Sequence, residues 1–203
     1  MRVMKFGGTS VGNAERIKGV CKIIEDSLPS KPIVVVSAIT GVTNALITLA
    51  NETSAAKRFR MFNEIRATHT KILEELRLDP RLFNAELTLL TTAAKKQRKC
   101  SKKVLDQFVS FGERFSASIV AATLQKRGID AKAFMASEIG MITDEHFGSA
   151  EPLPTSLNLI KRKVGALTVV PVITGYIGKT KKGEMTTLGR GGSDYTAAII
   201  GAA

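Results

Sequence analysis

The hydrophobic pattern changes twice in the first part of the chain. "RVMKF" (2–6) reads as a short strand, and residues from about 13 to 28 then repeat apolar side chains at spacings of three and four. Asn13 is a suitable N-cap for this predicted helix, and Pro29 ends it. "IVVVSA" (33–38) is a β-branched run typical of a strand buried on both faces. This order predicts a βαβ unit, and therefore a parallel sheet with a right-handed crossover.

The middle of the chain has the composition of helices. Residues 45 to about 127 carry almost no strand signal, and Asp79-Pro80 marks a turn between two of the predicted helices. The last of them ends near Gly128 and bears one apolar stripe, made of Val104, Phe108, Phe111, Phe115 and Ile119. Such a stripe is more often core than a cofactor site. We assign it to the core and treat about 51–127 as a helical insertion.

Strand signals return in the last third of the chain. "AKAFM" (131–135) and "LTVVPVITGYIG" (167–178) read as sheet with interspersed helix, and "TKKGEM" (180–185) reads as a hairpin tip. An apolar helix then begins with "DYTAAIIG" (194–201). We predict an α/β fold, a three-layer αβα sandwich with a mainly parallel sheet. A finished domain of this type normally adds another strand, so the C-terminus is expected to be a truncation point.

The net charge indicates which classes of partner to expect. The 203 residues carry a formal net charge of +12, which suggests anionic partners such as nucleotide phosphates, acidic metabolites or nucleic acid. Aromatic residues make up only 5% of the chain, which leaves few stacking platforms for nucleic acid. Much of the excess charge lies in "KKQRKCSKK" (95–103), and such a run is usually a solvated helix face. We therefore expect no nucleic-acid partner.

Cysteine, histidine and hydropathy give mainly negative expectations. Cys21 lies on the apolar stripe of the first helix and Cys100 among lysines, which is the pattern of two unlinked thiols in a reducing compartment. His69 and His146 lack metal-ligand spacing, so we expect no metal site formed by the protein alone. The N-terminus lacks the apolar core of a signal peptide, and no apolar run is long enough to span a bilayer. A cytoplasmic protein, or its stromal or matrix equivalent after removal of a transit peptide, is the expectation.

Glycine-rich junctions between strands and helices are the candidates for chemistry. The first joins the opening strand, with Lys5, Gly7 and Gly8, to the first helix. "SAITGVTN" (37–44) follows the buried strand, and "TLGRGGSDYTAA" (187–198) leads into the last helix. Glycines let backbone N–H groups approach an anion, and a helix N-terminus adds positive potential. Because ligands bind at the carboxyl edge of parallel sheets, the three junctions are expected to face one crevice.

The residue types at these junctions suit phosphoryl transfer to a carboxylate. A positioned cation such as Lys5, together with backbone amides, stabilises the negative charge on the transferring group. Arg190 offers a planar, bidentate partner for a substrate carboxylate. The ammonium group of an amino acid needs a nearby carboxylate, for which Glu113 in "SFGERFSA" (110–117) is the candidate.

Several of these stretches together resemble one family. "KFGGTSV" (5–11), "VVVSAITGVTNAL" (34–46) and "SFGERFSA" look like the amino-terminal half of an aspartate kinase, in the amino acid kinase family. "FGSAEP" (147–152), "ITGYIG" (173–178) and "TTLGRGGSDYTAA" (186–198) continue the likeness over nearly the whole chain. The lysine-sensitive monofunctional class looks closest. The resemblance implies ATP-dependent phosphorylation of the L-aspartate side chain to 4-phospho-L-aspartate, the first step of lysine, threonine and methionine biosynthesis, with ATP and Mg²⁺ as cofactors.

The resemblance also implies roles for individual residues. Lys5 resembles the lysine that stabilises the γ-phosphate, and Asp194 resembles the residue that orients this lysine. Arg190 matches the arginine that holds the α-carboxylate of aspartate, and Glu113 matches the glutamate near its amino group. Tyr176 stands where the family often has phenylalanine. The remaining matches are substrate-loop or pocket positions, Ser37, Thr43 and Ser193, and phosphate-cradling glycines, Gly7, Gly8, Gly191 and Gly192.

The chain departs from the family pattern at its end. Family members follow "GRGGSD" with a nucleotide-binding portion and regulatory ACT domains, and neither is found here. The 203 residues are therefore expected to be the N-terminal, aspartate-binding lobe, with little or no kinase activity on their own. The last helix would present an apolar face, so self-association into a homo-oligomer is a further expectation.

Two other functions remain open from the sequence. Another amino acid kinase, acting on acetylglutamate or glutamate, shares the Gly-Gly start, but "GRGGSD" with an early "KFGGTSV" argues against it. A non-catalytic binding or assembly module built on the same lobe is favoured if the chain is a natural product of this length.

Overall fold

A parallel sheet forms the centre of the molecule. The computed structural model describes residues 1–96 and 100–203, and within them β1 (Arg2–Phe6), β2 (Pro32–Val36), β5 (Val170–Thr174) and β3 (Ala131–Phe134) pair in the order β1-β2-β5-β3. The three pairings are all parallel, with Lys5 opposite Val35 and Ala133 opposite Val172. The predicted βαβ start is confirmed, because α1 (Ala14–Asp26) connects β1 to β2. Asn13 caps α1 by accepting a hydrogen bond from the Arg16 amide.

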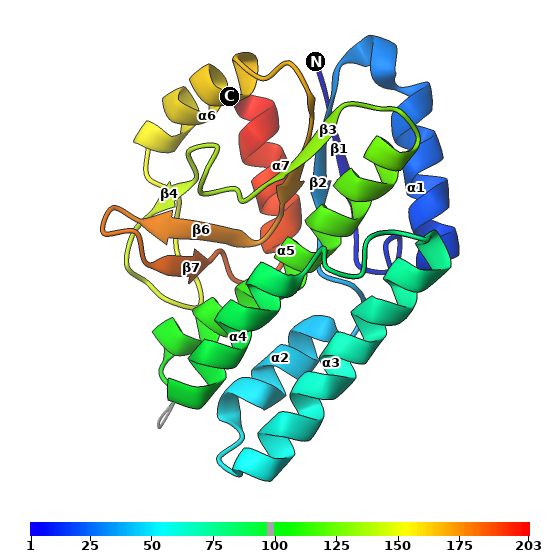
Figure 1. Cartoon of the computed structure of the whole chain (residues 1–203). Helices are drawn as coiled ribbons and strands as arrows, with labels where there is room; N and C mark the ends of the chain where they lie inside the picture. The colour runs from blue at the N-terminus through cyan, green and yellow to red at the C-terminus, as the bar shows by residue number, and fades with distance from the viewer. Residues whose placement is uncertain (97–99) are drawn as a thin grey trace.

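Helices cover both faces of this sheet (Figure 1). The alternation along β2 shows the two cores: Val34 and Val36 pack with α1 and α5 (Lys102–Lys126), while Ile33 and Val35 pack with α6 (Thr155–Gly165) and α7 (Gly192–Ala202). Every residue of β2 is buried, as expected for a strand covered on both sides. The predicted αβα sandwich with a mainly parallel sheet is confirmed.

The helical part of the chain divides into two. The helices α2 (Val42–Asn51), α3 (Ala55–Leu76) and α4 (Asn84–Lys96) stand beyond the sheet, whereas α5 runs from them back across one sheet face (Figure 1). The expected insertion over about 51–127 therefore includes one helix, α5, that belongs to the sandwich itself. The stripe assigned to the core is buried from Phe108 to Ile119, and only Val104 is half-buried. The basic run 95–103, which was predicted to be a solvated helix face, lies partly outside the described residues.

A small second sheet lies beside the first. Within the described residues, β4 (Ile142–Thr143), β6 (Ile177–Thr180) and β7 (Met185–Thr187) pair in the order β4-β6-β7, and β6 and β7 form the antiparallel hairpin expected at 180–185. The apolar run 167–178 is thus divided between β5 and β6. The break falls at Tyr176, which has a left-handed φ of 67°.

The remaining features concern helix ends, thiols and hydropathy. A short 3₁₀ turn, η1 (Leu28–Ser30), follows α1. Cys21 is buried, Cys100 is partly exposed, and both are free thiols. Nowhere in residues 1–96 and 100–203 is a helix both long and apolar enough to cross a bilayer.

Candidate active site

The three glycine-rich junctions meet at the carboxyl ends of β1 and β2. The Gly8 carbonyl accepts a hydrogen bond from the Thr40 amide at 3.3 Å, which joins the first junction to the second. The Gly175 amide donates to the Val36 carbonyl at 2.8 Å, and Gly175 lies directly against Ser193 of the third junction. This edge of the sheet is where parallel α/β folds bind ligands.

A cavity of about 390 Å³ lies where these junctions converge. Ten of the twelve candidate residues line it: Lys5, Ser37, Thr43, Glu113, Tyr176, Arg190, Gly191, Gly192, Ser193 and Asp194. Ala38, Gly148 and Gly189 complete the lining. The polar side chains come from β1, α2, α5 and α7 and from the loops between them, so the fold brings together residues almost 190 positions apart.

Larger cavities lie elsewhere on the chain. One of about 740 Å³ is bordered by Pro32 and Val170 at the amino ends of the strands, and one of about 560 Å³ lies between α4, α5 and the β6–β7 hairpin. Among the described residues, the first is lined by no arginine, and in the second Lys103 is paired with the partly exposed Glu184 rather than with a buried carboxylate. We therefore assign the candidate site by its chemistry rather than by its size.

Lys5 supplies the cation of the site. Its ammonium group forms an ion pair with the Asp194 carboxylate, with 2.7 Å between Nζ and Oδ1. Gly7 and Gly8 do not line the cavity, but Gly7 lies beside this ammonium group. A Cβ placed on Gly7 would be 3.7 Å from Lys5 Nζ, and one on Gly8 would be 2.5 Å from the Ala38 carbonyl oxygen. Only glycine at position 8 therefore allows the first two junctions to pack together.

Glu113 is the buried carboxylate of the site. Its Oε1 accepts a hydrogen bond from the Ala38 amide at 3.1 Å, while Oε2 has no partner within the described part of the chain. The neighbouring Gly112 lets α5 come this close, because a Cβ there would lie 2.7 Å from Ala38 Cβ. Burial raises the pKa of Glu113 to about 8, against the opposing effect of the Ala38 hydrogen bond. A cationic ligand group beside Oε2 would restore the ionised form.

Arg190 lies in a tight turn between β7 and α7, and Ser193 lies in the first turn of α7. Gly189 and Gly191 have φ values of 72° and 74°, which glycine adopts without strain, and they place Arg190 at the exposed rim of the cavity. Gly192 packs against the Tyr176 ring, where a Cβ would lie 2.8 Å from the nearest ring carbon. The turn thus places Arg190 on the solvent-exposed side of the site.

Tyr176 forms one wall of the cavity at the crossing between the two sheets. Its amide donates to the Thr196 hydroxyl at 3.1 Å, and its carbonyl accepts from the Leu188 amide at 2.8 Å. These bonds hold the left-handed backbone at this position, which is unusual for a residue with a side chain. Burial of the phenol raises the pKa of Tyr176.

A second buried carboxylate, Asp106, was not among the sequence candidates. It accepts hydrogen bonds from the amide and hydroxyl of Thr187 and from the amide of Gly148, which itself lines the cavity. A signal was present, because Asp106 lies seven residues before Glu113 on one helix, and that spacing puts both carboxylates on the same face. The apolar stripe beside them is the stronger sequence pattern on this helix.

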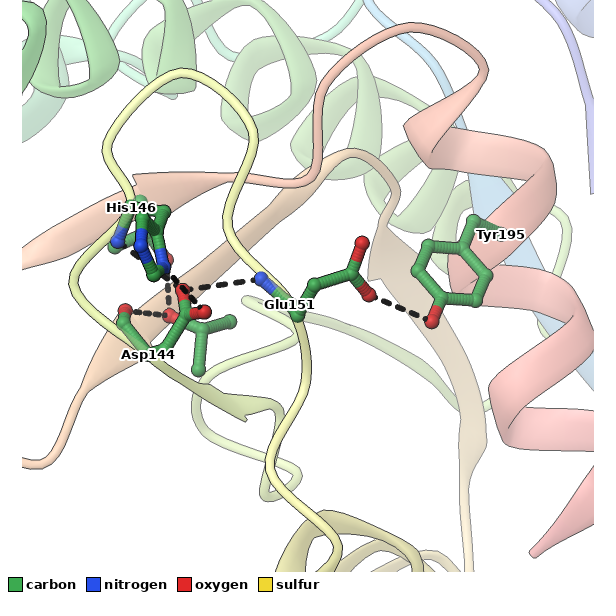
Figure 2. A network of polar contacts seen from close by, with 6 residues as sticks. Asp144, His146, Glu151 and Tyr195 are labelled. Carbon is green, nitrogen blue, oxygen red and sulfur yellow. Dashed lines mark hydrogen bonds and ion pairs between the residues drawn. The ribbon is translucent and has the colours of Figure 1, made fainter.

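The loop 144–151 borders the cavity on the side of Gly148. Asp144 and His146 interact with each other at its outer end, and the Glu151 amide also donates to Asp144 (Figure 2). The Glu151 carboxylate then accepts a hydrogen bond from the Tyr195 hydroxyl of α7 at 3.0 Å. Burial alone would raise the pKa of Asp144, but its hydrogen bonds with His146 and Glu151 together hold that pKa below its usual value. The loop is thus tied to the helix that carries Asp194.

The whole chain matches a known family and known structures. Residues 1–203 match the model of the amino acid kinase family. The chain is 36% identical to aspartokinase 1 (chloroplastic) of Arabidopsis thaliana over 99% of its own length and 38% of the plant protein. It is also 36% identical to the lysine-sensitive aspartokinase 3 of Escherichia coli K12, with 98% of this chain and 45% of that protein covered.

A solved structure agrees with these relatives. The E. coli aspartokinase III complex with aspartate and ADP (R-state) superposes with a TM-score of 0.87 at 32% identity, covering 98% of this chain and 46% of that one. The chain therefore spans less than half the length of the relatives it matches. With a family match over its full length and the junctions of its fold in place, the chain belongs to the amino acid kinase family.

Proposed function

We propose that the protein containing this chain transfers the γ-phosphoryl group of ATP to the side-chain carboxylate of L-aspartate. The product, 4-phospho-L-aspartate, would enter lysine, threonine and methionine biosynthesis. One observation carries the proposal: Lys5, Glu113 and Arg190, from three separate parts of the chain, line one cavity at the carboxyl edge of the sheet. The similarity to aspartokinases, one of them solved with aspartate and ADP, supports it.

The substrate would be held by opposite charges at its two ends. Glu113 Oε2, buried and without a partner among the described residues, suits the ammonium group of aspartate. Arg190 suits the α-carboxylate, because guanidinium binds carboxylate in a bidentate manner. Ser37, Thr43, Tyr176 and Ser193 would line the space between them. This arrangement leaves the side-chain carboxylate free to point toward Lys5.

The phosphate side of the site would be built from Lys5 and the glycines. ATP supplies the phosphoryl group when bound. The open space around Gly7, next to Lys5 Nζ, fits a phosphate held by backbone amides, and Gly191 and Gly192 open the N-terminus of α7 toward the same cavity. Asp194 would orient Lys5 through the observed ion pair. Lys5 would then stabilise charge that develops on the transferring group.

Mg²⁺ would be held mainly through the nucleotide phosphates. In the part of the chain that the structure describes, no group of three or more histidine, cysteine, aspartate or glutamate side chains is placed to hold a metal ion. Phosphate oxygens and water are the usual magnesium ligands in phosphoryl-transfer sites, with one or two carboxylates added. Asp194, whose carboxylate is 73% exposed beside the cavity, is the carboxylate nearest to that role.

The 203 residues would act as the aspartate-binding lobe of a longer catalytic unit. Since the chain covers 38% and 45% of its two relatives, most of the ATP site is proposed to come from sequence outside these residues. The lobe alone would then show little or no turnover, and it could self-associate as a homo-oligomer. We propose a cytoplasmic location, or a stromal one as for the chloroplastic relative.

A comparison of substrates tests this function. ADP release by the complete protein, meaning the full reading frame that contains this chain, would be followed with ATP and either L-aspartate, L-glutamate or N-acetyl-L-glutamate. Turnover specific to L-aspartate is expected. Faster turnover with either alternative acid would assign the protein to another amino acid kinase, and the absence of turnover with all three would favour a non-catalytic binding module.

A further inference from the structure

Asp106 lies at the junction of three elements that surround the candidate site. It is 1% exposed, and its carboxylate accepts hydrogen bonds from Gly148 N at 2.9 Å, Thr187 N at 3.0 Å and Thr187 Oγ1 at 2.8 Å. Its partners are 42 and 81 positions away in the sequence. One carboxylate on α5 therefore joins the loop 144–151 to the end of β7.

These two partners lead directly into the cavity wall. Gly148 itself lines the cavity, and Thr187 is the last residue of β7, two positions before Gly189. The Thr187 carbonyl accepts from the Ala150 amide at 2.8 Å, which closes the loop against the strand on its other side. Gly189 passes so close to Ser149 that a Cβ would lie 3.4 Å from its Cα. Asp106 thus fixes the point from which the turn carrying Arg190 departs.

The same helix holds the opposite wall of the cavity. Glu113 lies two helical turns beyond Asp106 and accepts a hydrogen bond from Ala38, on the loop after β2. One face of α5 therefore contacts both sides of the site, with Glu113 at one end and Asp106 at the other. The separation between Glu113 and Arg190 depends on this helix, because the turn bearing Arg190 is attached to it through Thr187.

We infer that Asp106 is a positioning residue that sets the spacing between Glu113 and Arg190, and so the length of the amino acid that fits between them. The inference rests on the proposed function, in which these two side chains hold the ends of aspartate. Asp106 itself does not line the cavity. It acts through the hydrogen bonds to Gly148 and Thr187, in which Oδ2 accepts both amides and Oδ1 accepts the Thr187 hydroxyl. An asparagine there would keep the shape but lose the charge that strengthens all three hydrogen bonds.

Substitution of Asp106 by Asn is the direct test. In the complete protein, Asp106→Asn is expected to raise the KM for L-aspartate about tenfold, because the amide lacks the charge that strengthens the three hydrogen bonds, while kcat changes by less than about twofold. Discrimination against L-glutamate should fall in the same variant. Thr187→Val, which replaces only the hydroxyl by a methyl group, should give a smaller rise in KM. Thr187→Ser, which keeps the hydroxyl, should have the wild-type KM.

Asp144→Asn is the matched control. Asp144 also accepts amide hydrogen bonds from this loop, but its partners, His146 and Glu151, lie within the loop itself (Figure 2). Its loss should leave KM and kcat within about twofold of wild type if the contact between α5 and β7 is what matters. An equal rise in KM for both variants would overturn the inference, because general loosening of the loop would then suffice.

A measurement that needs no activity separates this inference from the proposed function. Amide hydrogen exchange in the 203-residue chain should show faster exchange in Asp106→Asn at Gly148 and Thr187 and also along 189–193, which Asp106 does not touch. Faster exchange at the two direct partners alone, with 189–193 unchanged, would reduce Asp106 to a local structural contact. If wild-type protein turns over no aspartate, the proposed function fails and this exchange pattern still decides the positioning role. If Asp106→Asn does not fold, the same pattern in Thr187→Val decides it.

Discussion

The burial of Glu113 predicts a fold whose stability falls as the pH rises through neutrality. Burial raises the pKa of Glu113 from 4.5 to about 8, so between these values the folded chain holds a proton that the unfolded chain has lost. Stability therefore decreases with increasing pH across this window, and it is highest, as far as this group is concerned, below the unfolded pKa. Glu113→Gln keeps the shape of the side chain and removes its titration.

The size of the effect follows from the same shift. Each tenfold change in proton affinity corresponds to about 1.4 kcal/mol, so the cost of burying Glu113 approaches about 5 kcal/mol at pH 8 and vanishes near pH 4. Urea unfolding of the 203-residue chain at pH 5, 6, 7 and 8 would measure it. The difference in unfolding free energy between Glu113→Gln and wild type should grow steadily over this series in favour of the variant.

A matched control separates the effect of burial from the effect of removing one negative charge. Glu64→Gln, on the exposed side of α3, also removes one negative charge but none from the interior. A stability difference for Glu113→Gln that stays flat between pH 5 and pH 8, or that merely equals that of Glu64→Gln, would refute the reasoning. Saturating L-aspartate should reduce the pH dependence, because its ammonium group would stabilise the ionised carboxylate.

Three further variants test separate parts of the site and core. In the complete protein, Lys5→Ala should lower kcat by about 10²-fold or more with little change in KM, since Lys5 would act mainly on charge in the transition state. Steady-state kinetics that show a change in KM alone would contradict that role. Arg190→Ala should instead raise the KM for aspartate by about 10²-fold, measured in the same assay, because it removes a ground-state carboxylate partner; an unchanged KM would argue against the assignment. Burial lowers the pKa of His69 to about 4, against the opposing effect of the hydrogen bond to the Ile65 carbonyl. The free energy of unfolding should therefore fall by up to about 3 kcal/mol as the pH drops from 6.5 to 4, because the unfolded chain binds a proton that the folded chain does not. Acid unfolding of His69→Phe should lack this loss.

The fold was predictable wherever its signals were local. The βαβ start rests on short-range patterns, a β-branched run, helical spacing and an N-cap, which the structure keeps at 2–36. The run 167–178 was predicted as sheet, which β5 and β6 confirm, but its division into two strands had no signal because hydrophobicity continues through the break. What divides it is tertiary: Gly175 has no room for a side chain against Ser193, and the chain leaves the main sheet there.

The site was predictable as a set of residues but not as a geometry. Lys5 and Arg190 stand out because a basic residue in a glycine-rich junction between a strand and a helix is typical of an anion-binding site. Asp106 does not stand out, since an aspartate in a helix is usually solvated, and its burial depends on partners from β7 and the loop 144–151. The unpartnered oxygen of Glu113 and its raised pKa likewise arise only when α5 packs on Ala38.

Trapping of the product tests the proposed reaction most directly. The complete protein would be incubated with ATP, Mg²⁺, L-aspartate and hydroxylamine, which converts an acyl phosphate to a stable hydroxamate. Aspartyl hydroxamate formed in equal amount to ADP, and lost in Lys5→Ala, is the predicted result. ADP release without hydroxamate, or hydroxamate formed from N-acetyl-L-glutamate and not from L-aspartate, would contradict it.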